Sequence, residues 1–577
     1  MSKKRREIDK KYKWDIGVMY PDETVWENDY ARAEKAALAF GKYTGTLGTD
    51  GKVLLKAFRE MDSIWQITEK VYVYARMKRD EDNAVSKYQT LADRSQTLIA
   101  RVSAALSFFT PEFLAIPKKK LETFRKDVKG LSGYDYVMDS LLRRKPHVLS
   151  DKEENLLAQF GEILGSTGEI FTMLNDADIR FGAVQNEKGK KVEVTHGNYI
   201  TFMESRDRQV RKAAYGAMYD AYEKQKNTLA ATYGYNTKTD VMVARVRGYG
   251  SALEHSLAGD NVPVSVYDNL IETVNKNLDV LHGYMDVRRK VLDVSKLHMY
   301  DIYVPLFTLT NDHVKFEDAA AMMQEALKPL GEAYGAKMAA GVKAGWIDVF
   351  ENMGKTSGAY SFGSYDSMPY ILMNYSGKLK DVFTLVHEMG HSMHSLYTRE
   401  KQPFRYGSHS IFTAEVASTV NESLLIRYLL ETRPAKREQK YLINLYIEEF
   451  RTTLFRQTMF AEFEKFTHAA VEGGAVLTAD FLSDAYGKLN EKYFGKHVIT
   501  DDSIRMEWSR IPHFYRAFYV YKYATGYSAA TAIADQIVND REKSVKGYLE
   551  FLKSGDSADP IDLLKIAGVD MSRPEPI

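Results

Sequence analysis

The segment 381–396, DVFTLVHEMGHSMHSL, constrains the fold of this chain more than any other. Its apolar residues recur at helical intervals and no proline interrupts them, so the sequence predicts a largely buried helix. Three polar side chains, His387, Glu388 and His391, lie within this apolar pattern. Burying them costs several kcal/mol unless each is paired or binds a metal ion. The helix therefore requires either a polar partner for each of them or a metal ion.

The spacing of these residues favours the metal ion. His387 and His391 are four residues apart and lie about 40° apart around a helix axis, so both imidazoles can reach one ion. Glu388 falls about 60° from His391, beside the ion, where a base acting on a water molecule would stand. The segment HEMGH matches the HExxH pattern of zinc proteases, and the geometry gives that match a physical reason.

Two histidines leave a zinc site incomplete, because zinc needs a third protein ligand and keeps a fourth position for water. Tyr397 occupies the position where a metzincin carries its third histidine, and His394 is predicted to pack or form hydrogen bonds instead. The better candidate is Glu415, in FTAEVASTVNESLL, which has a helical pattern. Glu422 lies on the same face and is predicted to accept the free N–H of a ligand imidazole. The alternative is that both acids face water.

Composition limits the class of protein. The chain has 577 residues, enough for a large core or for two lobes around a cleft. Lys and Arg number 79 against 78 Asp and Glu, a formal charge of +1, so neither nucleic acid nor an anionic membrane is an expected partner. Cysteine is absent, so a metal site must use histidine, carboxylate or water. No apolar run of signal or membrane-spanning length was found, and the predicted location is cytoplasmic.

The pattern along the chain predicts a mainly helical fold with few strands. Helical spacing dominates up to about residue 174, and 179–184 and 191–195 then alternate like a β-hairpin. We predict an N-terminal helical region, 1–195, with this hairpin near its end, followed by a catalytic region, 196–577. A short strand is expected at 299–305.

A β element is predicted just before the HEMGH helix. Glycines, Pro369 and the β-favouring run 370–375 indicate extended chain. As an edge strand, this run would bind an extended peptide through its free backbone groups, whereas an internal strand would cover the helix. The residues predicted to contact a substrate here are Gly358, Ala359, Tyr360 and Tyr370.

A third segment, 511–533, reads IPHFYRAFYVYKYATGYSAATAI. Hydrolysis of an amide builds negative charge on the carbonyl oxygen, which phenol or imidazole donors stabilise. His513, Tyr515 and Tyr521 are the predicted donors. The alternative for each tyrosine is a packing role in the core.

With these motifs assembled, the sequence resembles the oligoendopeptidase F family, relatives of thimet oligopeptidase and neurolysin. The similarity lies in GAYS, PYILMNY, HEMGH, AEVASTVNE and PHFYRAFYVYKYATG, and in the early KWD. The resemblance implies a mainly helical, two-lobed metallopeptidase around a deep channel that admits short unfolded peptides. It assigns one zinc ion to His387, His391 and Glu415, the catalytic base to Glu388, and the donors to His513, Tyr515 and Tyr521.

The expected function is therefore zinc-dependent hydrolysis of internal bonds in short unstructured peptides, as in peptide catabolism. A carboxypeptidase or dipeptidyl carboxypeptidase of the same zinc class is the alternative within hydrolases. A non-catalytic peptide-binding protein that keeps the helical framework is a remote alternative. The sequence makes no prediction of the oligomeric state.

Overall fold

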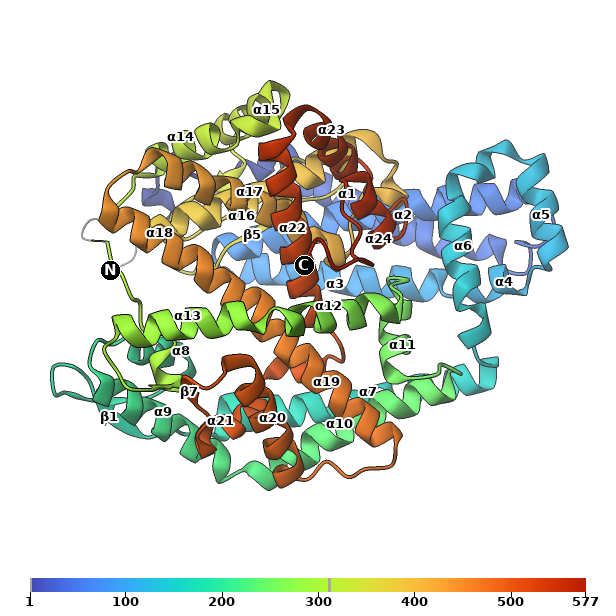
Figure 1. The fold of residues 1–577 in the computed structure, drawn as a ribbon. Helices are drawn as coiled ribbons and strands as arrows, with labels where there is room; N and C mark the ends of the chain where they lie inside the picture. The colour runs from blue at the N-terminus through green and yellow to red at the C-terminus, as the bar shows by residue number, and fades with distance from the viewer. Residues whose placement is uncertain (1–2, 310–312) are drawn as a thin grey trace. The chain divides into compact units, whose positions relative to one another are not determined.

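The computed structural model describes residues 3–309 and 313–577, and helices dominate this part of the chain (Figure 1). The mainly helical fold predicted from the sequence is confirmed. Contacts divide the chain into two compact units, each made of separate stretches. Unit 1 comprises Met1–Pro146, Asn311–Leu429 and Ala530–Val569, and unit 2 comprises His147–Thr310, Leu430–Ala529 and Asp570–Ile577. The boundary predicted at 195 falls inside unit 2, because periodicity does not reveal which distant segments pack together.

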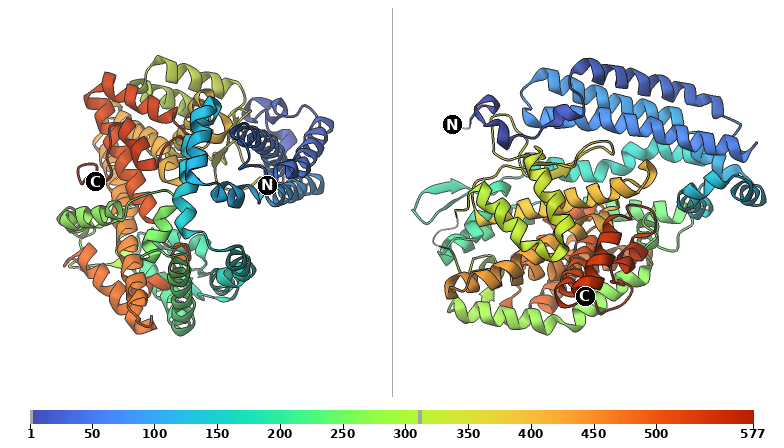
Figure 2. Two further views of the ribbon diagram at one scale, coloured as in Figure 1. Left: turned by 90° about the vertical axis from the view of Figure 1, so that its right-hand side faces the viewer. Right: turned by 90° about the horizontal axis from the view of Figure 1, so that it is seen from above.

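Unit 1 begins with three long helices, α1 (Glu23–Ala39), α2 (Gly51–Glu81) and α3 (Ser86–Leu106), which lie side by side (Figure 2). Asp22 caps α1 by accepting a hydrogen bond from the backbone N–H of Val25 at 3.1 Å. Trp26 is fully buried between these helices, and its indole N–H donates to the carbonyl of Val71 at 2.9 Å. Three shorter helices follow: α4 (Phe109–Ala115), α5 (Lys118–Asp127) and α6 (Asp135–Arg144).

One stretch in the described part of the chain, Ser86–Ala115, is long and apolar enough to cross a membrane by length and composition. It spans α3 and α4. About a third of its apolar window is buried, and Leu98, Val102 and Leu106 pack into the core of unit 1. Core helices satisfy the same test, so this stretch is weak support for a membrane span.

A small sheet precedes the HEMGH helix. It contains β4 (Ile347–Asp348), β5 (Tyr360–Phe362) and β6 (Tyr370–Leu372) in the order β4-β6-β5. The strand β6 is parallel to β4 and antiparallel to β5. The run predicted from 370 therefore forms the internal strand, and β4 and β5 are the two edge strands.

Tyr370 requires a correction to the predicted substrate contacts. Its side chain is fully buried, and its hydroxyl donates to the carbonyl of Asp15 at 2.9 Å. A substrate cannot reach a side chain in that position, so Tyr370 supports the sheet from within the core.

The sheet leads into α16 (Leu379–Lys401), which is followed by α17 (Ile411–Thr432). The carboxylate of Asp381 accepts hydrogen bonds from the backbone N–H groups of Ser376 and Lys378, at 2.8 and 3.0 Å, and fixes the start of α16. Unit 1 also contains four helices from its second and third stretches: α14 (Phe316–Ala326), α15 (Glu332–Lys343), α23 (Arg541–Leu552) and α24 (Pro560–Ile566).

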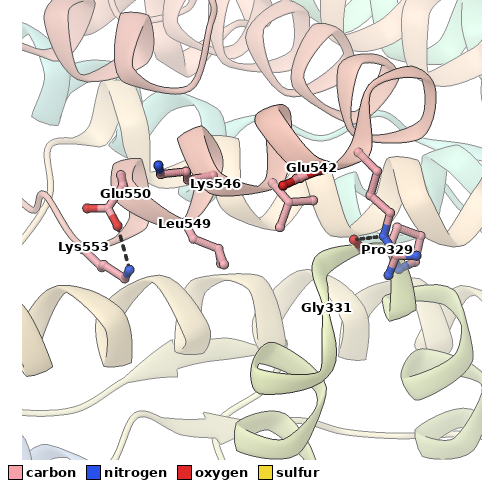
Figure 3. A pocket seen from close by; sticks show the side chains of 9 residues that line it. Pro329, Gly331, Glu542, Lys546, Leu549, Glu550 and Lys553 are labelled. Atoms are coloured by element: carbon pink, nitrogen blue, oxygen red, sulfur yellow. Dashed lines mark hydrogen bonds and ion pairs between the residues drawn. The ribbon is translucent and has the colours of Figure 1, made fainter.

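A pocket of about 520 Å³ lies between α23 and the turn before α15 (Figure 3). Arg541 closes one end by donating to the carbonyls of Lys328 and Pro329, at 2.6 and 3.0 Å. Val545 and Leu549 line the pocket, while Lys546 and other charged side chains surround it. It shares no lining residue with the HEMGH segment.

Unit 2 is also helical. The predicted hairpin is present, with β1 (Ala183–Gln185) antiparallel to β2 (Lys191–Glu193). The strand predicted at 299–305 is wrong: β3 (Leu297–His298) pairs with β7 (Val498–Ile499), and a 3-10 turn follows at Met299–Asp301. The helices of this unit are α7 (Asp151–Thr172), α8 (His196–Met203), α9 (Arg208–Glu223), α10 (Lys226–Val246), α11 (Ala252–Ala258), α12 (Val264–Lys276), α13 (Leu278–Val291), α18 (Lys436–Glu449), α19 (Arg456–Glu472), α20 (Ala479–Phe494), α21 (Asp502–Arg505) and the first half of α22 (Tyr521–Asn539).

Candidate metal centre

The helices α16 and α17 of unit 1 bring three possible metal ligands together. His387 and His391 lie on successive turns of α16, and Glu415 lies in the first turns of α17. One ligand atom from each of the three lies within 4.8 Å of the others. Among the described residues, no other group of His, Cys, Asp and Glu meets this criterion.

The distances within this group suit a small cation. The two Nε2 atoms of His387 and His391 are 3.2 Å apart. The Glu415 Oε2 atom lies 3.4 Å from the His387 Nε2 atom and 3.7 Å from that of His391. Ligand atoms about 2.0–2.1 Å from a tetrahedral zinc ion are about 3.3 Å from one another. The chain therefore holds two imidazoles and a carboxylate at the separations that such an ion requires.

The remaining ring nitrogens of the two histidines are also held. The Nδ1 atom of His387 lies 3.4 Å from the Glu422 Oε1 atom, in the contact predicted from the sequence. His391 forms its other hydrogen bond with the backbone of Ala414. Such contacts fix the orientation of the two rings, so that both Nε2 atoms point to the same place. Ala414 was not predicted, because a backbone acceptor leaves no residue-type signal.

The charges of the group favour a cation. Burial lowers the pKa of His387, but hydrogen bonds to Glu415 and Glu422 outweigh it and raise that pKa overall. The same hydrogen bond from His387 lowers the pKa of Glu415. Burial, with the neighbouring His387, lowers the pKa of His391 to about 4. The site therefore contains an ionised carboxylate beside an imidazole that keeps its lone pair, and both are ligands for a divalent metal.

Glu388 stands next to these residues but is not part of the ligand group. Its side chain is 8% exposed, and burial raises the pKa of this carboxyl to about 7. The backbone N–H of Ser361, in β5, donates a hydrogen bond to it. The Ser361 hydroxyl also lies 2.8 Å from that of Ser392 on α16. The edge strand therefore orients a carboxyl group whose pKa suits proton transfer near neutrality.

Gly390 explains how α16 and α17 approach closely enough to share a metal. A Cβ atom at this position would lie 2.5 Å from the Cα atom of Ser418 and 2.7 Å from the carbonyl oxygen of Ala417. Both contacts are with the backbone of α17, which cannot rotate away as a side chain can. Gly390 was not predicted from the sequence, because its role depends on a helix more than twenty residues away.

Replacing Gly390 by alanine is expected to separate the two helices and to lower metal affinity at least about 10-fold, since the ligands would no longer converge. Metal content after dialysis and the melting temperature would show this. Gly283→Ala on α13 is the matched control, because a Cβ atom there meets nothing within 4 Å. Wild-type metal binding in Gly390→Ala would contradict this role for the glycine.

His394 is a packing residue, as predicted. Its ring is 1% exposed and stacks on that of His409, with centroids 4.1 Å apart and planes inclined by 9°. Phe551 lies against it at 5.2 Å. Burial lowers the pKa of both histidines, which keeps this pair of rings neutral.

Three of the predicted substrate contacts precede or begin the edge strand β5. Gly358 has a positive φ of 82°, a conformation that favours glycine, and its carbonyl accepts a hydrogen bond from Asn374 at 2.8 Å. Ala359 follows it, and Tyr360 donates through its hydroxyl to the Asp80 Oδ2 atom at 2.8 Å. All three are at least partly exposed. Their contact with a substrate stays a prediction.

The predicted oxyanion donors belong to unit 2, and they have different surroundings there. His513 lies near two tyrosines that were not predicted: the Tyr523 hydroxyl is 3.5 Å from its Nε2 atom, and the Tyr519 ring is stacked at 6.1 Å. Tyr515 is partly buried and stacks on Phe171 at 4.4 Å.

Tyr521 is fully buried, and its ring packs against that of Tyr267 at 5.1 Å. This burial corrects its assignment as a donor to substrate. In the sequence, the alternating tyrosines at 519, 521 and 523 could not be distinguished, because the burial of each depends on contacts with other helices.

Comparisons with known proteins identify the family of this chain. Peptidase family M3 matches residues 201–577, and the oligopeptidase F family matches residues 112–181. The chain is 44% identical to oligopeptidase PepF of Bacillus subtilis over 573 residues, covering 99% of this chain and 86% of that protein. It is 43% identical to an oligoendopeptidase F homolog of Lactococcus lactis, covering 99% of this chain and 95% of that one.

Solved structures give the same result. The crystal structure of oligoendopeptidase-F from Enterococcus faecium aligns with a TM-score of 0.74 and 39% identity, covering 96% of this chain and 95% of that one. A putative peptidase from Chlamydophila abortus aligns with a TM-score of 0.93 and 33% identity, covering 100% of this chain and 97% of that one. This chain therefore belongs to peptidase family M3, among the oligoendopeptidase F enzymes, which are metalloendopeptidases.

Proposed function

We propose that this protein is a zinc-dependent oligoendopeptidase that hydrolyses internal bonds of short unstructured peptides. The observation that carries the proposal is the convergence of His387, His391 and Glu415 on one point, with the carboxyl of Glu388 beside them. Two imidazoles and a carboxylate are a donor set that suits zinc. When bound, the ion would polarise the scissile carbonyl and lower the pKa of a water molecule.

Glu388 is the residue that moves the proton. Its carboxylate accepts a proton from the attacking water and later delivers it to the leaving amine. A carboxyl with its ordinary pKa would accept this proton poorly, whereas the raised pKa of the buried Glu388 lets it accept the proton from water and still release it to the amine. The Ser361 N–H orients the carboxyl during the reaction.

The edge of β5 is the proposed substrate-binding strand. No strand pairs with its outer side in the described part of the chain, so its backbone groups can bind an extended peptide. Gly358, Ala359 and Tyr360 would contact the substrate there. This mode of binding requires a substrate backbone that is free of its own hydrogen bonds, which favours short unfolded peptides over folded proteins.

We propose that His513, with Tyr519 and Tyr523, supplies donors to the negative charge that develops on the substrate carbonyl. These three rings form one group, with Tyr519 and Tyr523 at 5.5 Å, and all are partly exposed. Tyr515 remains a candidate for the same role. A location in the cytoplasm, one zinc ion per chain and a role in peptide catabolism complete the proposal.

Metal analysis combined with a peptide blocked at both ends tests this function. The purified protein is expected to contain one zinc ion per chain and to cut the blocked peptide internally. A chelator should abolish the cleavage, and added zinc should restore it. Cleavage restricted to peptides with a free C-terminus would favour a carboxypeptidase, and the lack of stoichiometric metal and of chelator-sensitive hydrolysis would favour a binding protein.

A further inference from the structure

The helix α7 in unit 2 is unusual because almost none of it is buried. None of the described side chains from residue 152 to residue 170 is buried. Phe171, near the end of α7, is buried, with 3% of its surface exposed. Most helices in proteins owe their stability to the burial of an apolar face. A helix of this length whose apolar side chains are exposed to solvent therefore presents a surface to which another molecule can bind.

The apolar side chains of α7 form one face. Leu156, Phe160, Ile163 and Ile170 are 44–63% exposed, and their spacing of three, four and seven residues places them along a single stripe. The neighbouring helix α10 faces α7 with Tyr235, which is 62% exposed, and with small, uncharged side chains. Contiguous exposed apolar surface of this kind marks a binding site more often than chance exposure.

The two helices lie side by side (Figure 1), and contacts at both ends show that they are antiparallel. Glu154 near the start of α7 pairs with Arg247 just after the end of α10 at 3.0 Å. Further along, the hydroxyl of Thr167 donates to the Asn236 side chain at 2.8 Å. Between and beyond these contacts lies a groove of about 700 Å³, lined by residues of α7 and α10 alone.

The lining of this groove contains no Asp, Glu, Lys or Arg. Charged residues make up 27% of the chain and concentrate on protein surfaces, so an uncharged surface groove is unexpected. The pocket in Figure 3, by contrast, has five charged residues in its lining. The groove is therefore suited to a neutral, apolar ligand and not to an anion or a nucleic acid.

The groove leads to the segment that carries His513. Phe171, at the end of α7, stacks on Tyr515 with centroids 4.4 Å apart, and Tyr233 of α10 meets the same ring at 6.2 Å. Both helices thus contact the turn Pro512–Tyr515, which carries His513, one of the proposed oxyanion donors. An unfolded peptide presents the apolar side chains that a folded protein hides, so a peptide substrate supplies the chemistry that this groove accepts.

We propose that the groove between α7 and α10 binds a segment of the peptide substrate away from the cleaved bond and selects uncharged, apolar side chains there. This inference rests on the proposed peptidase function. It makes Ile163, Ile170 and Tyr235 specificity-determining residues. A second copy of this chain is the competing occupant, and the experiment distinguishes the two.

The test compares Ile163→Asp with Val280→Asp. These residues are both aliphatic, lie on helices of unit 2, and are 63% and 62% exposed, so the control matches the charge, context and exposure of the variant. The substrates are peptides blocked at both ends that share one cleavable core. One contains the core alone, and two longer ones extend it with leucine and phenylalanine or with aspartate.

We expect Ile163→Asp to lower kcat/KM for the long apolar peptide by about 10-fold or more, through KM, because a charge in the groove cannot be solvated once the peptide covers it. Cleavage of the core peptide should stay unchanged, and Val280→Asp should resemble the wild type on all substrates. Ile170→Asp is made in parallel and replaces Ile163→Asp if circular dichroism shows that the latter is unfolded.

Equal kcat/KM of wild type and Ile163→Asp on the long apolar peptide would overturn the inference. So would light scattering that shows a wild-type dimer and a monomeric Ile163→Asp, since the groove would then be an interface between copies. Neither result affects the peptidase proposal, which fails only if the wild-type enzyme leaves the core peptide uncut.

Discussion

Replacing Glu388 by glutamine is expected to reduce peptide turnover by about 10³- to 10⁴-fold while leaving the metal in place. Glutamine has the same shape and can still accept the hydrogen bond from the Ser361 N–H, but it cannot take a proton from water. The three ligand atoms of the metal lie on other residues, so metal affinity should change little. The measurements are kcat/KM on an internally quenched peptide and the zinc content of the dialysed protein.

Glu400→Gln is the control for this variant. Glu400 lies on the same helix, is exposed, and forms an ion pair with Lys337 at the surface. Its replacement should leave both turnover and zinc content unchanged, since exposed ion pairs contribute little. Full turnover in Glu388→Gln would show that another group acts as the base. Loss of zinc in that variant would instead show that Glu388 belongs to the ligand group.

The parts of the site that lie on α16 could be predicted because a helix fixes them locally. The spacing of His387 and His391 determines their geometry once the segment is helical, and the apolar pattern around them establishes that it is. Glu415 and Glu422 required one more assumption, that the next helix packs against the first. The structure places both acids against His387, at 3.4 Å each.

The features that depend on contacts between distant segments were missed or misassigned. Gly390 permits a close approach of two helices, and Ala414 acts through its backbone, so neither has a signal in residue type. Tyr370 and Tyr521 are indistinguishable in sequence from exposed tyrosines, and only packing shows that both are fully buried. The same reason applies to the two units, because each joins stretches that segments of the other unit separate in the sequence.

At the groove between α7 and α10, the sequence fails to reveal exposure, not burial. The apolar stripe of α7 has the periodicity of an ordinary core-facing helix, and from sequence alone Ile163 would be assigned to a core, as would the aromatic Tyr235 of α10. The structure leaves both more than half exposed. A pattern that predicts burial, on a helix that is not buried, is therefore the observation on which the proposed binding site rests.

Replacing Glu415 by glutamine is expected to remove the metal and with it all measurable turnover. The variant loses the ionised oxygen that lies 3.4 and 3.7 Å from the two imidazole nitrogens, and a neutral amide is a poor ligand for zinc. The matched variant is Glu422→Gln, seven residues along the same helix, which holds the Nδ1 atom of His387. It should weaken metal binding only about 10- to 100-fold, because it orients a ligand without being one.

Titration with zinc distinguishes the roles of Glu388, Glu415 and Glu422. At saturating zinc, Glu422→Gln should recover most of its turnover, because the ligand set is intact once the ion is forced into place. Glu388→Gln should bind zinc at wild-type concentrations and stay inactive, since no amount of metal replaces a proton acceptor. Glu415→Gln should need far more zinc than either. A Glu415→Gln protein that retains one tightly bound zinc ion after dialysis would mean that a different acid completes the site, and the mechanism assigned to α16 and α17 would have to be rebuilt around it.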